Sequence, residues 1–425
     1  MNLLKQKSFS VNFKSKINYA FLAMSIAVLM ASAGFVPLEL IGIKLVSPIS
    51  RCVFDQVDAQ NVVLEVDSSK SYQAVNIELT KGKFGHRCPR QRADIFKRVY
   101  KPNRDNKIII DFAPLETGYY HITAKTTAGK KIGSWEITKY PYKKNSVLIR
   151  NSVPYYNGEP FLMIGLFHTS DPVVDIISTE NQQGISSEML TRDKMLKSVK
   201  ERGFNTVHYS WYVGSKEFYQ AAARYGLMVV SESRKELGNV AELIDQPNIF
   251  GWYALDEPHE SMASACTVLY EVYKQTDPYH PVMTAFYNED PFALFGNTPM
   301  IDIAVPDPYL ITGPDPDFTR ITDRVESCKK MLSYDPATCV FIAPQLFTAT
   351  NIWNGFEPTY DQMRSQVYTA VLAGAKGVFY YSYYTHELLT DGMSLNPKRK
   401  HWFLPESNLW DSIGRLNAEL IKLKT

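Results

Sequence analysis

The chain has 425 residues, of which 45% are hydrophobic and 13% aromatic, and its formal net charge is +2. This length gives room for about two or three domains of ~150 residues. The near-neutral charge, without a dense basic cluster, gives no case for nucleic-acid binding. The many aromatic residues fit either core packing or flat platforms that stack on a sugar ring.

Residues 1–33 are predicted to be a signal peptide. A lysine-containing start precedes an uncharged, largely apolar stretch over residues 17–38, and Ala31-Ser-Ala33 supplies the small residues that a signal peptidase needs. The alternative is an uncleaved membrane anchor, because ~20 apolar residues can span a bilayer, although Pro37 and Glu39 shorten the usable span. We therefore expect a secreted or periplasmic protein, or else an anchored one with its folded part outside the cytoplasm.

Export would permit disulfides, and the chain has five cysteines. Cys52 with Cys88, and Cys328 with Cys339, are the pairs that close short loops within one domain, so these two bridges are predicted. Cys266 is expected to be a buried free thiol. Spacing alone cannot prove connectivity. The cysteines and histidines show no zinc spacing, so neither a metal nor another cofactor is predicted.

Residues 45–145 are predicted to form an accessory β-sandwich. Short segments alternate apolar and polar side chains and are separated by Lys/Gly/Asn/Asp turns, a pattern typical of strands. The segment Leu115-Glu-Thr-Gly-Tyr-Tyr120 resembles the tyrosine corner of immunoglobulin-like sandwiches, in which a Tyr hydroxyl binds the backbone of a crossing loop. The expected strands are residues 61–66, 72–79, 93–100, 107–112, 119–126 and 131–139.

Residues 146–425 are predicted to form a (β/α)8 TIM barrel. A small hairpin over 147–158, with Asn157-Gly158 as a turn, is followed by eight repeats of an apolar strand and an amphipathic helix. No Gly-rich phosphate turn follows a strand, which argues against an open doubly wound sheet. The expected strands are 161–167, 206–211, 227–231, 249–255, 281–287, 300–306, 340–346 and 377–383, and the expected helices are 187–202, 216–225, 240–245, 262–276, 292–295, 320–332, 359–373 and 405–423.

The carboxyl ends of the predicted strands carry many polar and aromatic side chains. In a barrel these ends converge on one face. The run Ile249-Phe-Gly-Trp-Tyr-Ala-Leu255 ends abruptly at Asp256, Glu257 and Pro258. A lone carboxylate there would usually be a salt-bridge partner, but several on one face favour a carbohydrate site. The other candidates are His168, Trp211, Glu232, Tyr287, Asn288, Asp307, Tyr309, Gln345, Phe347, Tyr384 and Glu387.

The segments "YYNGEPFLMIGL", "RGFNTVHYSW", "FGWYALDEP", "DPYHPV" and "AGAKGVFYYSYY" resemble, in content and order, the barrels of clan A glycoside hydrolases of the family 2 type. The resemblance covers about two thirds of the chain, from Val147 onward. It implies a glycosidase that hydrolyses O-glycosidic bonds of a poly- or oligosaccharide. It also implies that Glu257, at the end of strand four, is the general acid/base, with Asp256 where the commoner pattern has Asn.

The sequence departs from this family at strand seven, where Gln345 stands in place of the nucleophile glutamate. Asp307 and Glu387 are candidates for the second catalytic carboxyl, and Glu232 is a third. A retaining mechanism needs ~5 Å between the two carboxyls and an inverting one ~6.5–9.5 Å. The alternative function is a carbohydrate-binding barrel that has lost hydrolysis. A metal-dependent lyase or aldolase is a weaker third reading, because no ligand cluster supports it.

Most of the candidate residues have both a functional and a structural interpretation. Glu257 next to Trp252 or Tyr253 would be partly desolvated, which raises a carboxyl pKa toward a value useful for an acid; otherwise it anchors a loop. Asp256 is expected to orient a neighbour or bind a sugar hydroxyl. Gln345 would bind a sugar 2-hydroxyl or satisfy a buried backbone group. The aromatic candidates Trp211, Tyr309, Phe347 and Tyr384 stack on sugar or pack at the rim.

Overall fold

The computed structural model describes part of the chain: residues 43–47, 61–68, 72–82, 93–141, 143–170, 191–210, 215–232, 237–296, 301–335, 337–347, 356–385 and 402–423. The predicted leader, residues 1–33, lies outside these ranges, as do Cys52, Cys88, Trp211 and Glu387. Among the described residues, no helix has the length and apolar character needed to cross a membrane.

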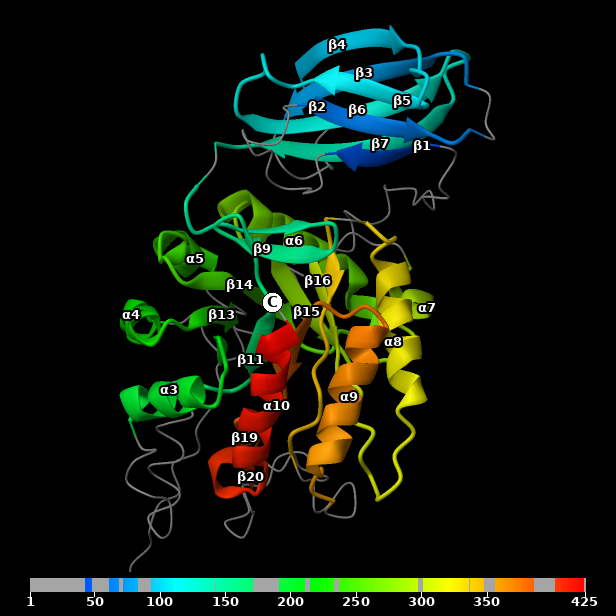
Figure 1. Cartoon of the computed structure of the whole chain (residues 1–425). Coiled ribbons are helices and arrows are strands. Elements are labelled where there is room, and N and C mark those ends of the chain that lie inside the picture. The colour runs from blue at the N-terminus through cyan, green and yellow to red at the C-terminus, as the bar shows by residue number, and fades with distance from the viewer. Residues whose placement is uncertain are drawn as a thin grey trace, which may run out of the picture. The chain divides into compact units, whose positions relative to one another are not determined.

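The strands before residue 140 form two antiparallel sheets that share one hydrophobic core (Figure 1). Every second residue of β2 and β3 points into that core, as the alternation in the sequence predicts. This confirms the β-sandwich, although its strand β1 was not predicted. One sheet has the order β1 (Ile43–Ser47), β2 (Asn61–Val66), β5 (Lys107–Asp111), and the other β4 (Ala93–Tyr100), β3 (Val75–Gly82), β6 (Gly118–Thr126), β7 (Lys131–Lys139).

The predicted tyrosine corner is confirmed. The hydroxyl of Tyr120 donates to the carbonyl oxygen of Glu116 at 2.6 Å. On the other side of the same loop, the buried amine of Lys139 donates to the carbonyls of Phe112, Ala113 and Leu115 at 2.7, 3.0 and 2.6 Å. Burial lowers the pKa of Lys139. The loop between β5 and β6 is therefore held by two side chains that satisfy backbone carbonyls.

The second half of the chain forms an eight-stranded parallel sheet that closes into a barrel. Its order is β17-β16-β15-β14-β13-β12-β11-β18. The residues after β17 complete the ring through bridges from Ile342 to Val378 and from Gln345 to Tyr381. The strands are β11 (Met163–Leu166), β12 (Thr206–Tyr209), β13 (Met228–Glu232), β14 (Ile249–Leu255), β15 (Val282–Phe286), β16 (Ile303–Pro306), β17 (Cys339–Val340) and β18 (Gly377–Tyr380).

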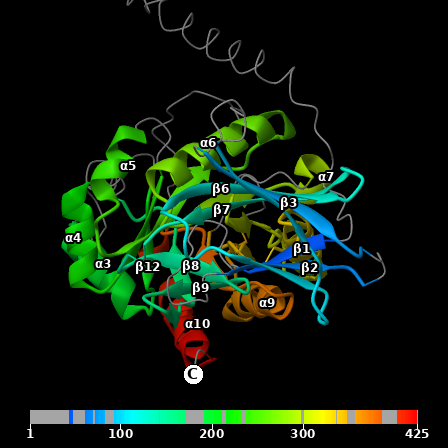
Figure 2. The ribbon, with the colours of Figure 1, turned by 90° about the horizontal axis from the view of Figure 1, so that it is seen from above.

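Helices alternate with these strands and lie outside the barrel (Figure 2). Three of them end at Gly203, Gly226 and Gly374, whose φ angles of 80°, 64° and 110° are those of left-handed caps. Thr359 and Gln362 form a capping box at the start of α9. The helices are α3 (Arg192–Glu201), α4 (Lys216–Arg224), α5 (Leu237–Leu243), α6 (Ala263–Thr276), α7 (Pro291–Phe295), α8 (Thr319–Met331), α9 (Tyr360–Leu372) and α10 (Leu409–Leu423).

The barrel interior is packed with side chains, and a small meander contributes to it. The meander consists of β8 (Val147–Arg150), β9 (Val153–Tyr156) and β10 (Glu159–Pro160). Val147 and Ile149 belong to the same core cluster as Met163, Phe250 and Phe341. Both of its turns have two consecutive residues with positive φ, Asn151-Ser152 and Asn157-Gly158, as two-residue hairpin turns require. The sequence predicted the second of these turns.

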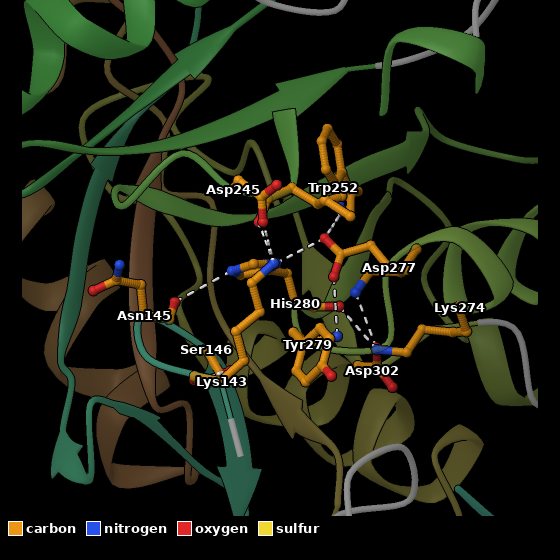
Figure 3. Close-up of polar contacts among 12 residues, drawn as sticks. Lys143, Asn145, Ser146, Asp245, Trp252, Lys274, Asp277, Tyr279, His280 and Asp302 are labelled. Carbon is orange, nitrogen blue, oxygen red and sulfur yellow. Dashed lines mark hydrogen bonds and ion pairs between the residues drawn. The ribbon is translucent and has the colours of Figure 1, made fainter. Parts of the chain in front are cut away.

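A buried polar network lies at the start of β15 and β16 (Figure 3). Asp277, fully buried, accepts hydrogen bonds from the Trp252 indole, the Tyr279 amide and the His280 ring. The other ring nitrogen of His280 contacts the carbonyl oxygen of Asn145 at 3.2 Å. Nearby, the buried amine of Lys274 pairs with Asp302 at 3.2 Å and donates to the carbonyl of His280; Tyr270 also donates to Asp302. This network joins the segment before the barrel to the barrel itself.

The predicted Cys328–Cys339 disulfide is wrong. Both residues are buried free thiols, as is Cys266, for which the prediction is confirmed. The physical reason is the side of the sheet that each occupies. Cys328, on α8, packs in the cluster between helices and strands, whereas Cys339, on β17, packs inside the barrel. The two cysteines are close in sequence, but their side chains therefore lie in different cores on opposite sides of the barrel sheet.

Candidate active site

Strand β14 positions the two adjacent carboxylates that the sequence singled out. It spans Ile249–Leu255, the predicted range, so that Asp256 and Glu257 come directly after its carboxyl end. Asp256 accepts a hydrogen bond of 2.6 Å from the hydroxyl of Tyr253. Glu257 has a φ of 43°, a left-handed conformation uncommon for a residue with a side chain. Both residues are exposed.

Asp307 comes directly after β16 and is only 2% exposed. Its carboxyl group is hydrogen-bonded to that of Glu257. Its Oδ1 atom accepts no hydrogen bond from the residues that the structure describes. Asp307, one of the candidates for the second carboxyl, therefore lies beside Glu257.

The electrostatics of this pair favour the protonated form. Burial, together with the adjacent Glu257, raises the pKa of Asp307 well above its usual range. Partial burial of its carboxyl also raises the pKa of Glu257, against the lowering effect of the hydrogen bond from Asp307. Asp256 raises both values, because a nearby negative charge disfavours further ionisation. The pair consequently holds a proton at a pH where an isolated carboxyl would have lost it.

Arg324 approaches Asp307 from α8. Its guanidinium donates to the carbonyl of Tyr287 at 2.9 Å and lies 3.9 Å from Glu289. Its positive charge opposes the raised pKa of Asp307, and burial lowers its own pKa. Among the described residues, no ion pair within 4 Å joins Arg324 to Asp307. The arginine therefore influences Asp307 without fixing it as a carboxylate.

Aromatic rings from several strand ends pack together near the carboxyl pair. Tyr309 lies 5.1 Å from Phe347 and 5.5 Å from Tyr381, measured between ring centroids. Tyr381 in turn contacts His168 at 5.1 Å. Burial raises the pKa of Tyr309 well above its usual range, with Asp307 adding to the shift. Tyr309, Tyr381 and His168 are half-buried and Phe347 is buried, so the first three retain surface that a ligand can contact.

Two further polar residues lie at the ends of the neighbouring strands. Glu232, the last residue of β13, is 2% exposed, and its charge reaches Tyr253. His208, on β12, is buried and lies 4.8 Å from the Phe167 ring and 5.2 Å from that of Tyr253. Both side chains are thus buried and interact with Tyr253 of β14.

Of the two roles predicted for Gln345, the structure supports the second, which is to satisfy buried backbone groups. Its side chain is fully buried and accepts from the amide of Ile311 at 3.0 Å. The same side chain donates to the carbonyls of Ile311 and Phe347, both at 3.2 Å. Its amide group is therefore engaged by backbone and offers no surface to a sugar hydroxyl, which corrects its assignment to substrate binding.

The remaining candidates differ in how far the structure brings them to the site. Tyr287 is 54% exposed, and Asn288 donates to the carbonyl of Pro258 at 3.4 Å, next to the carboxyl pair. Tyr384 begins β19 (Tyr384–Thr385), a short strand paired with β20 (Trp402–Phe403); the side chain of Tyr384 lies outside what the structure describes. Trp211 and Glu387 also lie outside the described residues.

Nothing in the sequence indicated Arg324 and Tyr381, and Tyr253 was marked only as a neighbour that would desolvate Glu257. Tyr253 faces the interior cluster together with Phe250, whereas Trp252 faces the helices and stacks on Tyr273. Simple alternation from Phe250 would have placed Trp252 inside, but the register of β14 shifts near Gly251. No local pattern marks Arg324 among the charges of α8. Among the described residues, no group of His, Cys, Asp and Glu could hold a metal ion.

The fold and the carboxyl pair define a (β/α)8 barrel, preceded by a β-sandwich, with an acidic site at the carboxyl ends of its strands. A β-glucuronidase from Ruminococcus gnavus is similar, with a TM-score of 0.47 and 15% identity over 84% of this chain and 66% of that one. A β-D-glucuronidase from Dictyoglomus thermophilum gives 0.45 and 11% over 89% and 68%. The chain thus spans about two thirds of the length of these proteins.

No protein family matches the chain in a scan of family profiles, and no curated protein matches its sequence. A shared fold at this low sequence identity does not assign the activity of these structures to this chain. The function has to be inferred from the side chains of this chain.

Proposed function

We propose that the protein is a glycosidase that hydrolyses O-glycosidic bonds of a poly- or oligosaccharide, with Glu257 as general acid. The observation that carries the proposal is the proton-holding contact between Glu257 and Asp307 at the carboxyl ends of β14 and β16. Active sites of (β/α)8 barrels lie at that end. A glycosidase needs a carboxylic acid that remains protonated near neutral pH, and burial together with like charge is the usual means of obtaining one.

In the proposed reaction, the protonated carboxyl of Glu257 gives its proton to the glycosidic oxygen as the bond from that oxygen to the anomeric carbon breaks. The sugar alcohol leaves with the bonding electrons. Water adds to the anomeric carbon and passes its proton to a carboxylate. The sequence candidates for the second carboxyl are Asp307 and Glu387, with Glu232 at the end of the adjacent strand as the third.

The half-buried rings of Tyr309, Tyr381 and His168 support a carbohydrate as the ligand. A pyranose presents a flat C–H face that packs on aromatic rings. Asp256, Asn288 and Tyr287 lie at the same end of the barrel and are exposed or half-buried, so they can hydrogen-bond to hydroxyl groups. Phe347, at 5% exposed, supports the rings of Tyr309 and Tyr381 from behind.

The test is hydrolysis of a panel of polysaccharides, with product sugars separated by chromatography. Glu257→Gln should lose ~10²–10⁴ in turnover, the usual contribution of a positioned acid, while still binding sugar. Glu260→Gln is the matched control, because Glu260 is an exposed glutamate three residues further on. Wild-type turnover in Glu257→Gln would contradict the assignment.

The second candidate function is a carbohydrate-binding barrel without hydrolysis. It is favoured by Gln345, whose side chain is buried and bound to backbone at the strand where the resembled enzymes carry their nucleophile. Calorimetric binding of an oligosaccharide that remains uncleaved after long incubation, in the wild-type protein and in Glu257→Gln alike, would support this alternative over the enzyme.

We further propose that the protein is exported, with residues 1–33 removed and Cys52 bonded to Cys88. The basic start, the apolar run and Ala31-Ser-Ala33 support the first statement. An oxidising compartment would permit the second. Intact-mass analysis of the exported protein, with and without reduction and alkylation, tests both. Retention of the first 33 residues would support the membrane-anchored form instead.

A further inference from the structure

We infer that Asp307 is a positioning residue that stays protonated in the resting protein and donates its hydrogen to the carboxyl of Glu257. The inference deepens the proposed function and rests on Glu257 as the acid. It assigns Asp307 a role other than that of the second carboxyl across the scissile bond.

The contact between the two carboxyl groups gives the first argument. Two carboxylates have only acceptor oxygens, so a hydrogen bond between them requires that one of the groups carries a proton. The direct contact of Glu257 with Asp307 is also shorter than the ~5 Å or ~6.5–9.5 Å that places a sugar carbon, or a water, between two catalytic carboxyls. Asp307 therefore lies beside the acid, on the same side of a bound glycosidic bond.

Burial decides which carboxyl keeps the proton. Asp307 is 2% exposed, and its Oδ1 atom has no hydrogen-bond donor among the described residues, so an ionised Asp307 would be a poorly solvated charge. Glu257 is exposed as a residue although its carboxyl is partly buried, so its charge would be better solvated than that of Asp307. The hydrogen that joins the two groups consequently resides on Asp307 and is accepted by an oxygen of Glu257, which carries a second proton of its own when it acts as the acid.

The charges around Asp307 agree with this arrangement. Asp256, held by the hydroxyl of Tyr253, adds negative charge next to the pair. The positive charge of Arg324 lowers the pKa of Asp307, but the Arg324 guanidinium donates its hydrogen bond to the carbonyl of Tyr287. The titratable groups that interact electrostatically with Asp307 are Glu257 and Asp256 after β14, Tyr253 in β14, Tyr309 after β16, and Arg324 and Cys328 from α8.

During turnover Asp307 would support the carboxylate that forms when Glu257 gives up its proton. The hydrogen bond from Asp307 then becomes charge-assisted, and such bonds are roughly twice as strong as neutral ones. The same bond fixes the orientation of a side chain whose backbone leaves the strand in a left-handed turn. No proton is lost from Asp307 in this cycle, which distinguishes it from a base or a nucleophile.

Substitutions of Asp307 give opposite results for the two roles. Asp307→Asn keeps a neutral donor, so turnover should fall by less than ~10-fold. Asp307→Ala removes the donor, and the alkaline limb of kcat/KM, which reports the acid in the free enzyme, should move to higher pH. If Asp307 were instead an ionised second carboxyl, Asp307→Asn would lose ~10²–10⁴ in turnover, and Asp307→Ala would move that limb to lower pH.

Infrared spectroscopy tests the protonation without any substrate. At neutral pH the wild-type protein should show the C=O stretch of a protonated carboxylic acid that is absent in Asp307→Asn. Asp317→Asn is the control, since the pKa of this exposed aspartate is lowered by its hydrogen bonds to Thr319. If no protonated band is lost in Asp307→Asn, the inference is wrong whether or not the protein hydrolyses sugars. A band that is lost in a protein without hydrolytic activity keeps the inferred protonation and removes only the proposed reaction.

Discussion

Replacing Asp277 by alanine should destabilise the protein strongly, because three donors lose their acceptor at once. The carboxylate receives the Trp252 indole at 2.8 Å, the Tyr279 amide at 3.0 Å and the His280 ring at 2.7 Å. Asp277 and His280 are 0% and 2% exposed, so water cannot replace the lost carboxylate without rearrangement.

The magnitude follows from these contacts. A buried donor left unsatisfied costs about 1–3 kcal/mol, and breaking a buried charged pair costs about 3–5 kcal/mol. These terms overlap, so we expect a loss of about 4 kcal/mol in the free energy of unfolding, a large part of the ~5–15 kcal/mol typical of a folded protein. Asp277→Asn keeps only one acceptor oxygen, whereas Tyr279 donates to Oδ1 and Trp252 to Oδ2 of the aspartate. It should therefore lose less than Asp277→Ala but still leave at least one buried donor unsatisfied.

Urea unfolding followed by tryptophan fluorescence is a suitable assay. Asp245→Ala is the control, because Asp245 is an exposed acid that pairs with Lys143 at 2.6 Å, and such surface pairs contribute about 0–1 kcal/mol. A loss below ~1 kcal/mol for Asp277→Ala, on the same scale as this control, would refute the reasoning.

The same variant predicts a pH dependence. Burial, the largest influence, raises the pKa of Asp277, but His280, Trp252 and Lys274 together outweigh it, and the pKa is lowered. A carboxyl whose pKa is lower in the folded protein stabilises it above the unfolded value of ~3.9. That contribution is lost as the pH falls through the folded pKa. The difference between wild type and Asp277→Ala should therefore be full at neutral pH and shrink in acid.

Three further outcomes are expected. Tyr120→Phe should cost the sandwich about 0.5–1.5 kcal/mol in thermal or urea unfolding, and an unchanged midpoint would contradict the tyrosine corner. Gly251→Ala should cost about 1–3 kcal/mol, because its Cβ would lie 2.5 Å from the carbonyl oxygen of Pro281; an unaltered melting temperature would show that β14 adjusts freely. Cys328 and Cys339 should react with a thiol reagent only after unfolding, and rapid labelling of the folded protein would disagree with their burial.

The sequence predicted the strands of the barrel well where they are continuous apolar runs bounded by turns or charges. Strand β14 is the best case, because its run ends at Asp256. Strand seven was predicted over residues 340–346, but β17 is only Cys339–Val340, followed by bridges at Ile342 and Gln345. Pro344 lies in this stretch and lacks the N–H that a ladder needs; its carbonyl still accepts from Tyr381.

The sequence predicted which residues lie at the strand ends of the candidate site, but it did not predict which of them contact one another. Convergence follows from barrel topology, and it correctly placed Glu257 and Asp307 at one face. The left-handed conformation of Glu257 could not be predicted, because no neighbouring glycine or turn motif marks it. The role of Gln345 depended on which carbonyls lay opposite it. The disulfide prediction failed for a related reason, since it used distance along the chain without the side of the sheet.

The tie between Asn145 and His280 has a consequence for how the two domains can be separated in the laboratory. The sequence pattern changes from short strands to alternating strands and helices at Ser146, which suggests that the chain could be divided there. Yet Lys143 donates to the carbonyl of Ile244, and the Tyr140 ring packs 5.9 Å from that of Tyr279. A barrel expressed from Ser146 onward would lack these partners. The ring nitrogen of His280 that contacts the carbonyl of Asn145 would also lose that contact. The residues between the domains thus belong structurally to the barrel, and the cut should come before Tyr140.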